Sequence, residues 1–202
     1  MRGQLKNWLL QNLANIVTVF GLVMAIWLLI IVVTSPEELW LILILAGVVG
    51  LTDFVDGKIA RRLKIKSGLG SALDRLRDKV FICPTLVILT WFYWPLVDKH
   101  LIFLAFTSAL VVLIISLEAL LLFSWFVGII KKLDVASNKF GQRKMFCQFI
   151  AVAVWLISLA VKRYFSFPLI NYSIYLIDLT LVVAVYFGVK SAEGYYQRYT
   201  EK

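Results

Sequence analysis

The chain has 202 residues, of which 61% are hydrophobic and 16% are charged. A typical soluble domain is about 45–50% apolar and about 25% charged, so this chain has too little polar surface to cover its apolar area in water. The same composition excludes a disordered chain, a collagen-like fibre and a disulfide scaffold. What remains is a single membrane domain, residues 1–202, built from several spanning helices.

Basic residues dominate the charge, with 21 Lys and Arg against 12 Asp and Glu and a formal net charge of +9. They occupy short segments between apolar runs, as the positive-inside rule and contact with anionic lipid headgroups predict. The sequence has no basic stripe with interleaved aromatic residues, so nucleic acid is not expected as a partner. The charge therefore points to the lipid bilayer.

Six apolar runs approach or exceed the roughly 20 residues that a membrane-spanning helix needs. In chain order they cover residues 13–33, 39–60, 72–97, 101–130, 145–161 and 169–189. A short amphipathic stretch from Gln4 to Leu13 predicts a separate helix along the cytoplasmic membrane surface. Because continuous apolar runs favour helices over a barrel, we expect an all-α, polytopic membrane protein with six transmembrane helices and this short N-terminal helix.

The distribution of Lys and Arg over the connecting segments predicts the orientation. They concentrate before the first run, between the second and third, between the fourth and fifth, and after the sixth. The positive-inside rule places these segments and both termini in the cytoplasm. The polar end of residues 39–60 and the polar start of residues 72–97 then share the cytoplasmic side.

Four aspartates gather at this polar side: Asp53, Asp56, Asp74 and Asp78. An acid at membrane depth is costly and indicates a functional site. The spacings of three and four residues put the members of each pair on one helix face. Four like charges converge only with counter-charge, and two divalent cations with oxygen ligands, Mg²⁺ or Mn²⁺, would supply it. Two such ions suit displacement at a phosphate.

Small residues and arginines accompany the aspartates. The small side chains of Gly57 and Ala60 leave room on the helix face beside Asp56, and Gly70 precedes Asp74 by four residues. Arg61 is suited to hold a phosphate. In the alternative interpretation, the acids and bases of residues 74–78 form a solvated, salt-bridged helix start that needs no metal. The number of acids and their spacing favour the metal site.

Residues 53–78 match the CDP-alcohol phosphotransferase signature D-x2-D-G-x2-A-R-x8-G-x3-D-x3-D at every specified position. The chain thus resembles the CDP-alcohol phosphatidyltransferase family, and its length and six apolar runs extend the resemblance over the whole sequence. The resemblance implies an integral membrane transferase of phospholipid biosynthesis. Such an enzyme displaces CMP from CDP-diacylglycerol or another CDP-linked lipid by an alcohol acceptor. The resemblance also suggests a homodimer.

The resemblance further implies roles for individual residues. Two divalent ions would be held by Asp53, Asp56, Asp74 and Asp78, and Asp78 would be the general base that activates the acceptor hydroxyl. The residues that would line the CDP pocket are Asp53, Asp56, Gly57, Ala60, Arg61, Gly70 and Asp74.

The segments around the signature bear on the acceptor. Residues 70–79 are similar to the GxxLDPxADK form of phosphatidylglycerophosphate synthases and cardiolipin synthases, with Arg75 and Arg77 in place of Pro and Ala. Residues 141–148 resemble the GKxKTxxQ element of these enzymes, and Glu118 stands where they carry an Arg-Glu pair. These matches favour glycerol 3-phosphate as acceptor. Phosphatidylglycerol, inositol phosphate, serine and an archaeal-type lipid alcohol stay open.

A phosphorylated acceptor requires cations, and Lys139, Arg143 and Lys144 are the candidates. Alternatively, these residues only follow the positive-inside rule. Of the other acids in apolar runs, Glu118 is a candidate for the polar cavity, and Asp178 is predicted to form a hydrogen bond with a neighbouring helix.

Two rival functions use the same residues. A cation transporter built on the aspartates would show inverted repeats or broken helices in matching halves, and the sequence has neither. A non-catalytic membrane scaffold related to these enzymes would be expected to lose one or more acids, and all four are present.

Overall fold

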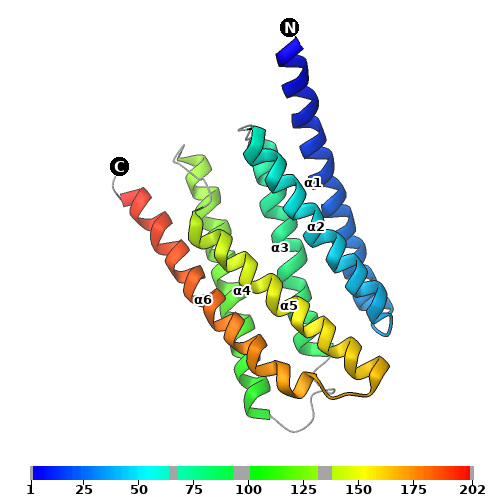
Figure 1. The fold of residues 1–202 in the computed structure, drawn as a ribbon. Coiled ribbons are helices and arrows are strands. Elements are labelled where there is room, and N and C mark those ends of the chain that lie inside the picture. The colour runs from blue at the N-terminus through cyan, green and yellow to red at the C-terminus, as the bar shows by residue number, and fades with distance from the viewer. Residues whose placement is uncertain (1, 64–67, 93–100, 132–137, 201–202) are drawn as a thin grey trace. The chain divides into compact units, whose positions relative to one another are not determined.

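The computed structural model describes the backbone of residues 2–63, 68–92, 101–131 and 138–200. Side chains are described at residues 16–52, 55, 78–91, 102, 104–131 and 138–200. These ranges hold helices and no strand: α1 (Arg2–Thr34), α2 (Leu39–Leu63), α3 (Gly68–Phe92), α4 (Leu101–Ile130), α5 (Lys139–Phe165) and α6 (Ile170–Thr200) (Figure 1). The all-α prediction is confirmed.

Four of these helices contain stretches that are long and apolar enough to cross a membrane. The stretches are Ile16–Thr34, Leu104–Ile130, Lys139–Phe165 and Ile170–Thr200, and α2 adds a shorter apolar stretch, Leu39–Thr52. The chain is therefore an integral membrane protein. The described residues contain six helices, as expected, whereas the count of six crossings stays a prediction.

The predicted separate helix at the N-terminus is wrong. The structure has one continuous helix, α1, from Arg2 to Thr34. No proline interrupts this segment, and residues 4–13 contain four Leu and two Gln, which are good helix formers. Since no stop signal separates the amphipathic stretch from the apolar run, the two join in one helix.

Other helix ends also differ from the apolar runs. The third and fifth helices begin at Gly68 and Lys139, earlier than the expected 72 and 145, and α6 continues past residue 189 to Thr200. A helix ends where caps and backbone breakers occur, while hydropathy marks only its apolar part. The earlier start of α5 places its basic residues in the first two helical turns.

Residues 1–85 form one compact unit, in which α1 packs against α2. The turn between them is short: the Ser35 amide donates to the Ile31 carbonyl at 2.8 Å, and the Glu38 amide donates to the Ser35 carbonyl at 3.1 Å. The buried apolar residues of the two helices include Ala25, Leu28, Val32, Ile42, Leu45, Ala46 and Val49. The unit thus holds α2, which carries half of the signature.

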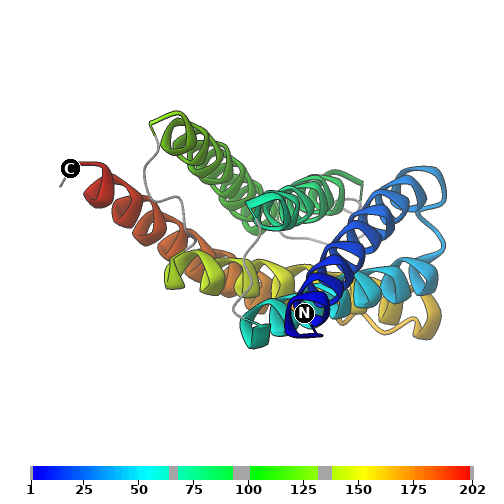
Figure 2. The ribbon, with the colours of Figure 1, turned by 90° about the horizontal axis from the view of Figure 1, so that it is seen from above.

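Residues 86–202 form a second compact unit, and α6 packs against both α4 and α5 within it (Figures 1 and 2). Its largest fully buried side chain is Trp155 of α5. The helix α5 ends at Phe165, and the left-handed backbone of its C-cap, Ser166 (φ 54°), turns the chain toward α6. Buried polar side chains in this unit include Thr107, Glu118, Lys144, Gln148 and Asp178.

Candidate active site

The signature aspartates lie on two helices, within the residues of the first unit. Asp53 and Asp56 belong to α2, and Asp74 and Asp78 belong to α3. Both segments are continuous helices, so each pair occupies positions about one turn apart on one face, as predicted. Asp78 is partly exposed, whereas the other three side chains lie outside the described residues.

The two helices are joined by few residues at their polar ends. Leu63 ends α2 and Gly68 begins α3, so the connecting backbone reaches at most about 18 Å. The predicted CDP-pocket residues Gly57, Ala60 and Arg61 belong to α2, and Gly70 lies near the start of α3. The side chains of these residues lie outside the described part of the chain.

The donors at these positions fit a hard divalent cation, because carboxylate oxygens are the ligands that Mg²⁺ and Mn²⁺ prefer. Among the described side chains, no group of three or more His, Cys, Asp or Glu residues forms a metal site. That set includes Asp78 and excludes the other three signature acids. Support for the predicted divalent cations thus comes from the carboxylate chemistry of the four signature positions.

The structure separates the three predicted acceptor cations. Lys139 and Arg143 are exposed on the first turns of α5, and with Gln142 and Phe146 they line an open hollow of about 380 Å³. The Arg143 guanidinium lies 5.8 Å from the centre of the Phe187 ring on α6, a cation–π contact. Two of the three predicted cations thus remain accessible to a ligand.

Lys144 is buried instead. Its ammonium group forms an ion pair with Glu118 of α4, and both side chains are only 5–6% exposed. The Gln148 amide donates to the same Glu118 carboxylate oxygen at 3.0 Å. This Glu118 cluster (Glu118, Lys144 and Gln148) joins two residues of the 141–148 element to the acid that the sequence singled out.

The start of α5 is fixed by a residue that the sequence prediction missed. The Asn138 side chain caps α5, accepting from the Gly141 amide at 2.7 Å. It also reaches α6, where its Nδ2 donates to the Ser191 carbonyl at 3.0 Å and its Oδ1 accepts from the Ser191 hydroxyl at 2.9 Å. An Asn before a helix is a recognisable cap signal, whereas its partner 53 residues away is not.

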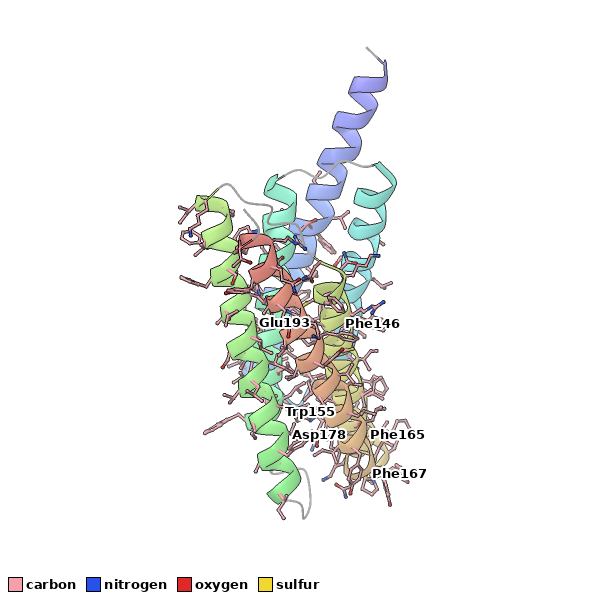
Figure 3. All side chains as sticks on the ribbon, turned by 90° about the vertical axis from the view of Figure 1, so that its left-hand side faces the viewer. Phe146, Trp155, Phe165, Phe167, Asp178 and Glu193 are labelled. Atoms are coloured by element: carbon pink, nitrogen blue, oxygen red, sulfur yellow. The ribbon has the colours of Figure 1, made fainter. Side chains whose placement is uncertain are left out.

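Asp178 fulfils its prediction. This residue of α6 is 6% exposed and accepts a hydrogen bond of 2.6 Å from the fully buried Thr107 hydroxyl of α4. Figure 3 shows Asp178 well separated along α6 from Glu193, which lies toward the C-terminal end of the same helix. Asp178 therefore joins two helices away from the start of α5.

The match to a protein family covers most of the chain. A profile of the CDP-alcohol phosphatidyltransferase family matches residues 11–188. The chain belongs to this family. It is accordingly a CDP-alcohol phosphatidyltransferase, a membrane enzyme of phospholipid biosynthesis that transfers a phosphatidyl group.

Individual relatives of this phosphatidyltransferase are identical to it at about a third of the positions within the aligned stretches. It is 32% identical to the CDP-diacylglycerol--glycerol-3-phosphate 3-phosphatidyltransferase of Bacillus subtilis (strain 168), over 77% of this chain and 71% of the relative. It is 35% identical to the CMP-forming cardiolipin synthase of Streptomyces coelicolor, over 41% of this chain and 39% of the relative. The glycerol-3-phosphate enzyme of Cereibacter sphaeroides is 35% identical over 42% of this chain and 38% of its own length.

Proposed function

We propose that this enzyme transfers the phosphatidyl group of CDP-diacylglycerol to glycerol 3-phosphate and releases CMP. The observation that carries the proposal is the complete signature over residues 53–78, on two helices that begin and end at one short connection. The acceptor is supported by the Bacillus subtilis relative, which aligns over most of both chains and is named for glycerol 3-phosphate.

In the proposed reaction, the acceptor hydroxyl oxygen attacks the phosphorus that carries the diacylglycerol. A bond forms between this oxygen and phosphorus, the bond from phosphorus to the CMP oxygen breaks, and CMP leaves with the electron pair. Asp78 takes the hydroxyl proton as general base. The CDP moiety would be bound by Asp53, Asp56, Gly57, Ala60, Arg61, Gly70 and Asp74.

The proposal includes two divalent cations, Mg²⁺ or Mn²⁺, bound by Asp53, Asp56, Asp74 and Asp78. When bound, they would neutralise the pyrophosphate and the charge that develops on CMP. The fit rests on the oxygen donors at helical positions about one turn apart. Lys139 and Arg143, exposed at the start of α5, would attract the acceptor phosphate, with Lys144 behind them in the Glu118 cluster.

The proposed topology has six crossings, both termini in the cytoplasm and the aspartates facing the cytoplasm, in a single functional domain that pairs as a homodimer. The lengths of α2 and α3 support the crossings, because 25 residues each give about 37 Å of helix. The basic segments described above support the orientation.

A second acceptor, phosphatidylglycerol, has one observation in its favour. The Streptomyces coelicolor relative, 35% identical over 88 residues, is named a CMP-forming cardiolipin synthase. In that reaction the same bonds form and break, and the acceptor carries its own lipid tails.

The test is CMP release by the purified, lipid-reconstituted protein from CDP-diacylglycerol with glycerol 3-phosphate, phosphatidylglycerol, inositol phosphate or serine. We expect turnover with glycerol 3-phosphate, its loss in EDTA and its return with Mg²⁺ or Mn²⁺. Asp78→Asn should lower kcat by about 10²–10⁴ because the general base is lost. Glu38→Gln, an exposed acid in the α1–α2 turn, is the matched control and should retain activity. Absence of CMP release with every acceptor would refute the proposal.

A further inference from the structure

The helix α6 presents three consecutive features to the start of α5. Phe187 lies under the Arg143 guanidinium and 6.3 Å from the Phe140 ring, measured between ring centres. One turn later, Ser191 exchanges two hydrogen bonds with Asn138. At Gly194, an added Cβ would lie 3.0 Å from the Asn138 Nδ2. We call residues 187–194 the α6 platform.

These contacts fix the first two turns of α5 in position and in rotation. The cap at Asn138 fixes where the helix begins, and its bonds to Ser191 fix that point against α6. Ser191 is 2% exposed and Asn138 is half-buried, so these bonds are partly shielded from competing water. The ring contact holds Arg143 one turn further on.

From these contacts we infer that Asn138 and the α6 platform are positioning elements for the acceptor: they orient Lys139 and Arg143 without contacting the substrate themselves. The inference rests on the proposed function, since it assigns these two cations to the acceptor phosphate. Lys139 directly follows Asn138, and the Arg143 guanidinium lies over the Phe187 ring of the α6 platform. A shift of the start of α5 therefore moves both cations together. A displacement of about 1 Å is enough to impair a binding geometry severely.

Two variants disturb the platform by different routes. Asn138→Ser retains a side-chain oxygen that can cap α5 but removes the Nδ2 donor and the reach to Ser191. Gly194→Ala leaves every bonding group in place and brings a methyl group to 3.0 Å from Nδ2, so the Asn138 amide has to shift by a few tenths of an ångström. Gly47→Ala is the matched control, because a Cβ at Gly47 in α2 would meet nothing within 4 Å.

The experiment measures initial rates of CMP release by the full-length protein in lipid, with CDP-diacylglycerol and the acceptor varied in turn. Asn138→Ser should raise the acceptor KM by about tenfold and Gly194→Ala by a smaller factor, with the CDP-diacylglycerol KM and the kcat within about twofold of wild type. Gly47→Ala should leave all three unchanged. A merely structural role would instead lower the active fraction and reduce kcat with both KM values unchanged.

The outcomes for the inference and for the proposed function are distinct. If the wild-type protein releases no CMP with any acceptor, the proposed function fails. If wild type is active but the platform variants keep the wild-type acceptor KM, or change both KM values in parallel, the positioning role is overturned and the reaction stands.

Discussion

Glu118 and Asp178 are buried to almost the same degree, at 4% and 6% exposure, in apolar helices of the same unit, and yet their partners differ in charge. Glu118 forms an ion pair with Lys144, whereas Asp178 accepts a hydrogen bond from the neutral Thr107 hydroxyl. A buried carboxylate needs either counter-charge or hydrogen-bond donors, and this unit uses both solutions. The comparison teaches that burial alone does not predict which kind of partner a buried acid has.

The position of each acid explains the difference. Glu118 contacts two residues of the 141–148 element, Lys144 and Gln148. Its charge is therefore paired with a cation on α5, the helix that also carries the proposed acceptor cations. Asp178 lies elsewhere on α6 and ties this helix to α4. Glu118 therefore binds a charged residue of the helix that carries Lys139 and Arg143, while Asp178 contributes a hydrogen bond between two helices.

The largest effect should come from Lys144→Met. This change removes the Lys144 cation from the buried Glu118 carboxylate, and removing one partner of a buried ion pair typically costs about 3–5 kcal/mol. The measurement is reversible denaturant unfolding in mixed micelles. The double variant Glu118→Gln, Lys144→Met should recover most of the loss, because neither charge remains. A cost below about 1 kcal/mol for the single variant would show that the pair is not a buried ionic contact.

Thr107→Val should have an intermediate effect. It keeps the shape of the side chain and removes the hydroxyl that donates to Asp178, and interhelical hydrogen bonds in membranes contribute about 1 kcal/mol. Ser116→Ala is the control on the same helix, since its exposed hydroxyl donates only to the Val112 carbonyl of α4 itself. A loss from Thr107→Val as large as that from Lys144→Met would contradict the distinction between the two acids.

The smallest effect should come from Glu193→Gln. Glu193 pairs with Lys190 at 2.8 Å on an exposed part of α6, where water and salt screen the charges. We expect no measurable change in Tm at moderate salt. A destabilisation comparable to that of Thr107→Val would mean that exposure does not weaken this ion pair, and the ranking of the three acids would fail.

Much of the fold could be predicted because hydropathy marks apolar helices directly. The segment from Leu101 to Ile130 was predicted with the bounds that the structure has. Helix ends governed by other signals were missed, as at α1, where an amphipathic stretch and an apolar run form one helix. A local pattern shows which residues favour a helix, and it shows less well where neighbouring stretches join.

The candidate site was predicted unevenly for a similar reason. The signature aspartates follow from spacing within one short stretch, and the hydrogen bond of Asp178 follows from the cost of an acid among apolar residues. The ion pair of Lys144 with Glu118 and the bonds of Asn138 to Ser191 join residues on different helices. Such contacts depend on how helices are rotated against each other, and a single sequence taken by itself does not specify this rotation.

The short link between α5 and α6 has a consequence for how this protein enters a membrane. Only residues 166–169 separate Phe165 from Ile170, and Ser166 already turns the chain back. Two long apolar helices joined so tightly must partition into the bilayer together, as one hairpin. In the proposed orientation its tip carries Lys162 and Arg163 to the far side, so biogenesis has to translocate two positive charges against the usual bias.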